Sequence, residues 1–168
     1  KQGAGPVVRA WIRQFRTSGW FRKHFFLVFY VSMMLFRTLL CRTIWGNPLD
    51  HVLGIWSLHN NGELYTENFE ILFLPFIVLL FWAQEERDHY KEKSIQDVLI
   101  LSFKISFLFS LGIEFCQLFF KLGTFQLADL FFNTVGGLLG GIWYWGFDRS
   151  RRKIESAIRR FGGWDVTP

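Results

Sequence analysis

Residues 98–147 contain two apolar runs joined by a short turn, and they read VLILSFKISFLFSLGIEFCQLFF (98–120), KLGTFQ (121–126) and LADLFFNTVGGLLGGIWYWGF (127–147). About 20 mostly apolar residues are enough for a helix to cross the hydrocarbon core of a bilayer. The runs are continuous rather than alternating, which excludes the strands of a membrane barrel. Because backbone polar groups inside lipid must be satisfied within the segment, each run predicts a membrane-spanning helix.

Two further apolar runs precede this pair. The first covers residues 25–45 and is interrupted by Arg37 and Arg42, and the second covers about 66–83. Of the 168 residues, 51% are hydrophobic and 21 are Phe, which is more aromatic surface than one soluble core of this size could bury. The sequence therefore predicts an all-α membrane protein with four transmembrane helices.

The basic residues indicate the orientation of these helices. Residues 1–24 hold six Lys or Arg, residues 84–97 hold three and residues 148–168 hold six, whereas residues 46–66 hold none. Cytoplasmic loops of membrane proteins carry the excess of Lys and Arg, so both chain ends are predicted to be cytoplasmic. That arrangement needs an even number of spans, which agrees with the four predicted from hydropathy.

Both basic ends carry apolar residues at helical spacing. These residues are Val8, Trp11, Ile12, Phe15, Ile154, Ala157, Ile158 and Phe161. Basic amphipathic segments of this kind suit the surface of an anionic inner leaflet, and juxtamembrane basic residues do not indicate nucleic-acid binding. The predicted division is therefore a basic amphipathic N-terminal segment (1–24), a four-helix membrane domain (25–147) and a basic C-terminal tail (148–168).

Polar residues in the third and fourth spans follow one side of each helix. At 100° per residue, one arc of about 120° in the third span collects Ser102, Ser106, Ser110, Glu114, Gln117 and Lys121. A narrow stripe in the fourth collects Asp129, Asn133, Gly136, Gly137, Gly140 and Tyr144. The pairs Gly136–Gly140 and Gly137–Gly141 are small residues four apart, which predicts a close approach by another helix.

Ionisable groups of both signs are predicted to gather in the outer half of the membrane. The candidate site residues are Arg37, Arg42, Glu114, Gln117, Asp129 and Asn133. Each charge would cost several kcal/mol facing lipid, so these side chains should face inward and pair. Two interpretations stay open, namely a buried ion-pair network that fixes helix register and a ligand site that opens toward the outer leaflet. The four His are scattered through tails and loops, so neither a metal site nor a cofactor is expected.

The third and fourth spans also resemble the VanZ-like family of teicoplanin-resistance-associated membrane proteins. Its pattern is Ser-x-x-x-Glu-x-x-Gln, a short turn, then Asp-x-x-x-Asn-Thr-x-Gly-Gly. The matching residues here are Ser110, Glu114, Gln117, Asp129, Asn133, Thr134, Gly136 and Gly137. The resemblance covers roughly residues 25–147. It implies a multi-pass protein of the bacterial plasma membrane, linked to low-level resistance to teicoplanin-type lipoglycopeptides and to a role in the cell envelope.

Three functions compete for the polar site. The first is binding or exclusion of a lipid-tailed amphiphile, with membrane lipids, a lipid-linked wall precursor or a lipoglycopeptide as partners. The second is a membrane enzyme that acts on a lipid head group, with Glu114 and Asp129 as acid and base and Arg37 or Arg42 holding an anion. No nucleophile motif or phosphate loop supports that reading, so a non-enzymatic role is favoured. The third is a small lipid carrier or transporter, which at four spans would need to be a homo-oligomer.

Overall fold

The computed structural model of the protein describes residues 5–40, 52–53, 59–60, 63–64, 72–85, 94–123 and 125–162. This part of the chain is helical except for one short hairpin, so the predicted helical class holds there. The helices are α1 (Gly5–Thr17), α2 (Gly19–Leu35), the π-helical turn η1 (Phe36–Leu40), α4 (Phe73–Gln84), α5 (Ile95–Phe120) and α6 (Leu127–Gly162). The hairpin is formed by β1 (His59–Asn60) and β2 (Glu63–Leu64).

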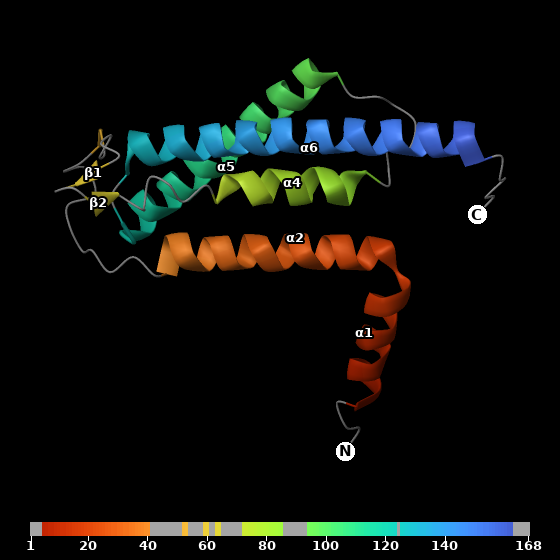
Figure 1. The fold of residues 1–168 in the computed structure, drawn as a ribbon. Helices are drawn as coiled ribbons and strands as arrows, with labels where there is room; N and C mark the ends of the chain where they lie inside the picture. The colour runs from red at the N-terminus through yellow and green to blue at the C-terminus, as the bar shows by residue number, and fades with distance from the viewer. Residues whose placement is uncertain are drawn as a thin grey trace.

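The N-terminal helix α1 turns sharply away from α2 (Figure 1). The break falls at Ser18, which is extended and whose Oγ accepts a hydrogen bond from the Phe21 backbone N–H at 3.2 Å. Such a side-chain cap satisfies one of the N–H groups that have no partner at a helix start. The rings of Trp11 and Phe21 meet edge to face, as do those of Phe15 and Phe25. The apolar face of α1 is therefore turned toward the aromatic start of α2.

The long helix α6 continues well past the predicted end of the fourth span. The sequence predicts a span that ends at 147 and a basic amphipathic tail after it, and in the structure one unbroken helix runs to Gly162. Residues 147–160 contain no Gly or Pro, and Asp148 pairs with Arg152 one turn further on. Such pairs support a helix, and with 36 residues α6 is about 54 Å long.

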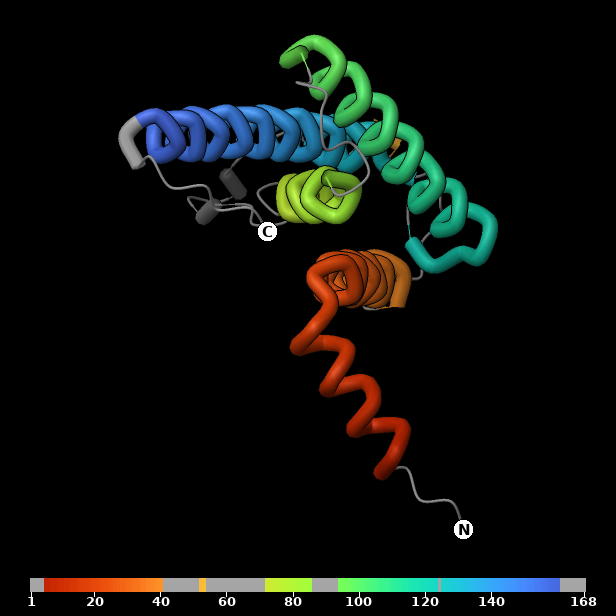
Figure 2. The backbone as a smooth tube through the Cα atoms, turned by 90° about the vertical axis from the view of Figure 1, so that its right-hand side faces the viewer, coloured from red at the N-terminus to blue at the C-terminus, as the bar shows by residue number. Residues whose placement is uncertain are grey.

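The four long helices lie alongside one another and alternate in direction. Figures 1 and 2 show α4 between α2 and α6, with α5 crossing α6 obliquely. The start of α2 meets the end of α4 through Lys23 and Glu85, and Tyr30 donates a hydrogen bond to the Leu72 carbonyl, so α2 and α4 are antiparallel. The α5–α6 pair is also antiparallel, because it is joined by the turn at 121–126.

The core is small and many apolar side chains are exposed. The buried hydrophobic cluster contains Met34, Phe73, Phe76, Ile77, Phe81, Val98, Ile113 and Tyr144. Outside it, large side chains such as Phe119 (82% exposed) and Trp143 (67% exposed) project from the helices. Exposed apolar side chains in this number are characteristic of helices that face lipid.

Two of the helical segments, Gly19–Leu40 and Ile95–Phe120, are long and apolar enough to cross a membrane. The α4 helix is apolar but has only 12 residues, and residues 66–71 of the predicted span 66–83 lie outside the described residues. The predicted span 25–45 is helical up to Leu40, and residues 41–45 are likewise outside the description. The predicted number of four spans therefore stays a prediction.

The hairpin is an element that the helical prediction did not include. His59 pairs with Leu64 and Asn60 with Glu63 in an antiparallel ladder. The two residues between the strands are Asn61 and Gly62, the dipeptide that two-residue hairpin loops favour. This signal was present in the predicted outer loop at 46–66.

Candidate functional site

The polar stripe of α5 lies in the interior of the helix bundle. Ser102, Ser106 and Ser110 are fully buried, and Glu114 and Gln117 are 2% and 1% exposed. Buried polar groups are costly unless they find hydrogen-bond partners, so the arrangement of their neighbours decides what the stripe does.

The inner part of the stripe packs against glycines of α6. A Cβ atom on Gly137 would lie 1.7 Å from Ser106 Oγ, and one on Gly141 would lie 2.2 Å from Ser102 Oγ. These two glycines therefore allow α5 and α6 to cross at close range, which is the geometry of small-residue contacts in membranes. Neither Ser102 Oγ nor Ser106 Oγ has a hydrogen-bond partner among the described residues.

A third glycine, Gly140, allows α4 to pack closely against α6. A Cβ atom on Gly140 would lie 2.5 Å from the Leu74 carbonyl oxygen and 3.2 Å from Ile77 Cβ. The fourth predicted packing residue, Gly136, is buried as well. The stripe of glycines thus serves two contacts, with Gly137 and Gly141 facing α5 and Gly140 facing α4.

Toward the C-terminal end of α5, Glu114 contacts the start of α6. Its Oε2 accepts a hydrogen bond from the Gln126 backbone N–H at 2.8 Å, one residue before the helix begins. The Leu130 N–H in turn donates to the Gln126 carbonyl, which places Gln126 at the cap of α6. The N–H groups of a helix N-terminus carry a partial positive charge, which suits a carboxyl oxygen at this position.

Gln117 joins α5 to the π-helical turn at the end of α2. Its Nε2 donates a hydrogen bond to the Thr38 carbonyl at 2.8 Å. Its Oε1 is buried and accepts no hydrogen bond from the described part of the chain. π-Helical turns are rare and often mark functional sites, and this one supplies the carbonyl that orients the Gln117 amide.

Asn133 and Asp129 complete the outer end from the side of α6. Asn133 Nδ2 donates to Ser110 Oγ at 2.9 Å, which links the two polar stripes directly. Asp129 is partly exposed in the first turn of α6, where an acidic residue suits the helix dipole. Glu114, Gln117, Ser110 and Asn133 are hereafter called the outer polar site, after the orientation that the sequence predicts.

The structure describes one of the two arginines of the candidate site. Arg37 lies in η1, one residue before Thr38, and more than a third of it is exposed. Arg42 lies outside the described residues. The predicted pairing of these arginines with Glu114 therefore stays a prediction.

The sequence model of the VanZ/LLP1 family matches residues 25–148. The chain belongs to the VanZ/LLP1 family. This confirms the resemblance seen in the third and fourth spans. Family membership and the two long apolar helices together support a VanZ-like membrane protein.

Neither the curated proteins nor the solved structures give a match to this chain. The family pattern can nevertheless be located in the fold. Ser110, Glu114 and Gln117 on α5 and Asn133 on α6 lie at the outer end of the α5–α6 pair, where they form the outer polar site. Thr134 donates its hydroxyl hydrogen bond to the Leu130 carbonyl within α6 and so contributes to the helix itself.

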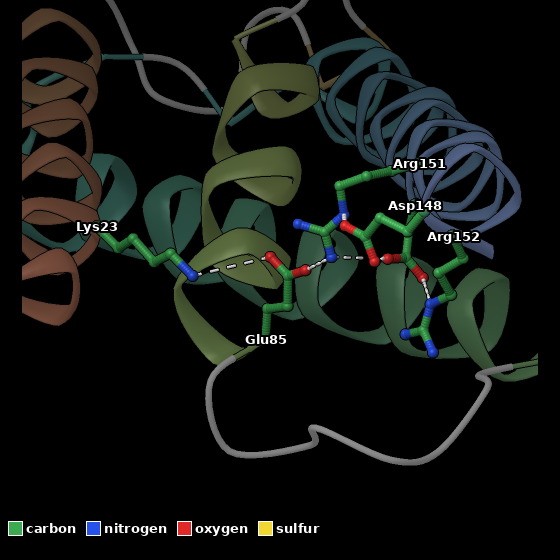
Figure 3. Close-up of polar contacts among 6 residues, drawn as sticks. Lys23, Glu85, Asp148, Arg151 and Arg152 are labelled. Atoms are coloured by element: carbon green, nitrogen blue, oxygen red, sulfur yellow. Dashed lines mark hydrogen bonds and ion pairs between the residues drawn. The ribbon is translucent and has the colours of Figure 1, made fainter. Parts of the chain in front are cut away.

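A second polar group, at the opposite end of the bundle, was not predicted from the sequence. Figure 3 shows Glu85 between Lys23 and Arg151, with Asp148 beside Arg151 and Arg152. Glu85 is hydrogen-bonded to Arg151 and lies 3.8 Å from Lys23 Nζ. Asp148 lies 3.3 Å from Arg151 Nη2 and 2.8 Å from Arg152 Nε. These five residues, called the inner cluster, join the cytoplasmic ends predicted for three spans.

The inner cluster is partly shielded from solvent. Burial lowers the pKa of the Arg151 guanidinium, but the hydrogen bond and charge of Glu85, followed by the charges of Glu155 and Asp148, outweigh burial and raise that pKa. Arg151 therefore stays charged at every physiological pH. The available signal is a carboxylate directly after the second apolar run and another after the fourth, but the prediction of topology uses only the Lys and Arg residues near these ends.

Proposed function

We propose that the protein is a four-span protein of the bacterial plasma membrane, and that its outer polar site binds or excludes the polar head of a lipid-tailed amphiphile. A lipoglycopeptide of the teicoplanin type and a lipid-linked wall precursor both have this chemistry. The proposal joins the family relationship to the geometry of the outer polar site.

The alternating directions of the four long helices support four spans. With the N-terminus in the cytoplasm, α2 and α5 run outward and α4 and α6 run inward, in agreement with the distribution of Lys and Arg. The turn of α1 at Ser18 supports an N-terminal helix on the inner membrane surface, because its apolar face is turned toward the aromatic start of α2.

One observation carries the binding role. Gln117 Oε1 is a buried acceptor without a donor among the described residues, and it shares the end of α5 with the buried carboxylate of Glu114. An unsatisfied buried acceptor costs roughly 1–3 kcal/mol, which a hydroxyl or amine of a ligand would recover. Sugar and amine groups of a lipid-tailed head offer such donors, and the exposed Phe115 and Phe119 offer apolar contact for its tail.

The test is the change Glu114→Gln. Gln keeps the shape of the side chain and an oxygen that can accept from Gln126, so the fold should persist while the charge is removed. Cells that express this variant should lose resistance to a lipoglycopeptide, and the purified protein should keep its melting temperature. The matched control is Asp97→Asn, which removes an exposed charge at the other end of the same helix and should leave resistance intact.

The results for Glu114→Gln distinguish a charge-dependent binding site from an ion-pair network and from a membrane enzyme. Full resistance in a stable Glu114→Gln protein would reject a site that depends on charge. A large drop in melting temperature, restored by adding Arg37→Gln, would favour the ion-pair network instead. Conversion of a purified lipid substrate by the parent protein, lost in Glu114→Gln, would favour the membrane enzyme.

A further inference from the structure

Four basic residues at the bend between α1 and α2 form no ion pair within the described part of the chain. They are Arg9, Arg13 and Arg16 on α1 and Arg22 near the start of α2, and all four are exposed. Two of them donate side-chain hydrogen bonds to backbone carbonyls, Arg9 to Gly5 and Arg22 to Arg16. Residues 1–49 contain no Asp or Glu. These four residues, called the N-terminal arginines, therefore keep a positive charge that attracts an anion.

The apolar face of α1 is covered only in part. Trp11 and Phe15 pack edge to face on aromatic rings at the start of α2. No side chain of α1 is buried, and three apolar residues closer to its N-terminal end are more than half exposed. These are Val7, Val8 and Ile12. A basic helix with an exposed apolar face needs a partner that offers both negative charge and an apolar phase.

The position of α1 relative to α2 indicates that this partner is a bilayer. Figures 1 and 2 show α1 crossing the direction of α2 at the start of α2. The ring of Phe15 lies 5.4 Å from the ring of Phe25, the first residue of the predicted span 25–45. The apolar face of α1 is therefore turned toward the bilayer interior. Trp20, at the same end of α2, is 50% exposed, and tryptophan side chains prefer the boundary between lipid and water.

The bend itself is fixed by hydrogen bonds. The Ser18 backbone N–H donates to the Gln14 carbonyl at 2.9 Å, and the Ser18 carbonyl accepts from the Arg22 N–H at 3.2 Å. Together with the Ser18 side-chain cap on Phe21, these bonds hold α1 across α2 before any lipid is bound. A preformed surface loses less conformational freedom on binding than a flexible tail does.

The charge of this surface selects among lipid head groups. Guanidinium groups bind phosphate oxygens, often through two parallel hydrogen bonds. Phosphatidylglycerol offers a phosphate with a net negative charge, whereas the ammonium group of phosphatidylcholine cancels the charge of its phosphate. Each basic residue next to an anionic leaflet strengthens binding about fivefold, so the N-terminal arginines favour the anionic lipid.

We infer that α1 and the start of α2 form a preformed binding surface for anionic phospholipids in the leaflet around the start of α2. Val7, Val8 and Ile12 insert among acyl chains, and the N-terminal arginines bind lipid phosphates. This surface lies at the opposite end of α2 from the outer polar site, so the failure of one proposal leaves the other intact.

The first experiment is native mass spectrometry of the purified full chain in mild detergent with equal amounts of dioleoylphosphatidylglycerol and dioleoylphosphatidylcholine. The two lipids have the same acyl chains and differ in net charge. The parent protein should retain phosphatidylglycerol in preference. The combined change Arg9→Gln, Arg13→Gln and Arg16→Gln should lower this preference at least about tenfold, because each arginine contributes about fivefold. Gln favours helices nearly as well as Arg, so the helix content should stay unchanged.

The matched control is Lys153→Gln, Arg159→Gln and Arg160→Gln together, which removes three exposed basic residues from the end of α6. This variant should keep the preference of the parent. Equal retention of the two lipids by the parent would overturn the inference. So would an equal loss of preference in both triple variants, because net charge alone would then explain it.

A second measurement locates α1 in the bilayer. In a variant without the native cysteines, a polarity-sensitive fluorophore is attached to Val8→Cys or, as the matched control, to Arg13→Cys, and the full chain is placed in nanodiscs that contain dioleoylphosphatidylglycerol. The label at position 8 should report apolar surroundings and the label at position 13 should report water. A label at position 8 that reports water would show that the bilayer does not cover this face, which would also overturn the inference.

Discussion

The close crossing of α5 and α6 predicts that Gly137→Ala destabilises the protein, although alanine favours helices. The added Cβ would lie 2.5 Å from Ser106 Cβ, whereas carbon atoms in contact are about 3.5–4.0 Å apart. Rotating the serine side chain moves Oγ away but leaves Ser106 Cβ in place. The two helices must therefore separate locally by about 1 Å or more.

Two opposing effects determine how much Gly137→Ala changes the free energy of unfolding. Overpacking of a tight contact costs about 1–3 kcal/mol, and exchanging Gly for Ala in a helix returns about 1 kcal/mol. We expect a net loss of up to about 2 kcal/mol in the free energy of unfolding, because about 1 kcal/mol of the overpacking cost is offset by the exchange of Gly for Ala. Gly146→Ala is the control in the same helix, because nothing lies within 4 Å of its added Cβ, and it should increase stability.

The assay is equilibrium unfolding in mixed detergent, followed by the helical circular dichroism signal. The double change Gly137→Ala with Ser106→Gly moves the single Cβ from α5 to α6, so stability should return to within about 0.5 kcal/mol of the parent. If Gly137→Ala stabilises the protein as Gly146→Ala does, the crossing is looser than the structure has it. A double variant as unstable as Gly137→Ala alone would also refute the argument.

Two other predictions concern the turn after α5 and the orientation of the chain. Lys121 ends α5 in the left-handed conformation, at φ 54°, so Lys121→Gly should raise the melting temperature by relieving about 1 kcal/mol of strain, and Lys121→Val should lower it. A fall in melting temperature for Lys121→Gly would show that the lysine side chain contributes more than the strain costs. In a variant without the native cysteines, an impermeant thiol reagent applied to intact cells should label Lys121→Cys and leave Lys153→Cys unlabelled; labelling of position 153 would reject the predicted topology.

Sequence periodicity predicted which residues share a face within a single helix. The burial of Ser102, Ser106 and Ser110 follows from their spacing of four, because residues four apart share a helix face. The glycine pairs likewise indicated a close contact. Which helix meets which glycine could not be predicted, since Gly140 contacts α4 and Gly137 contacts α5 from neighbouring positions.

Contacts between segments that are distant in the chain could not be predicted from the sequence. The hydrogen bond from Gln126 to Glu114 depends on how the turn at 121–126 folds back, and the bond from Gln117 to Thr38 spans 79 positions. The inner cluster has the same origin, because Glu85 and Arg151 are brought together only when α4 and α6 lie parallel. Charges near span ends are frequent, so nothing in the local pattern indicated that Glu85 and Arg151 would form a pair.

The unbroken helix α6 connects the outer polar site with the inner cluster. Asn133 lies near its outer end and Arg151 near its inner part, and the glycine contacts at 137, 140 and 141 lie between them. A rigid helix that is packed tightly near its middle changes its tilt about that point. The two ends of α6 would then move in opposite directions relative to the neighbouring helices. If α6 tilted about the glycine contacts, Asn133 and Arg151 would therefore move in opposite directions.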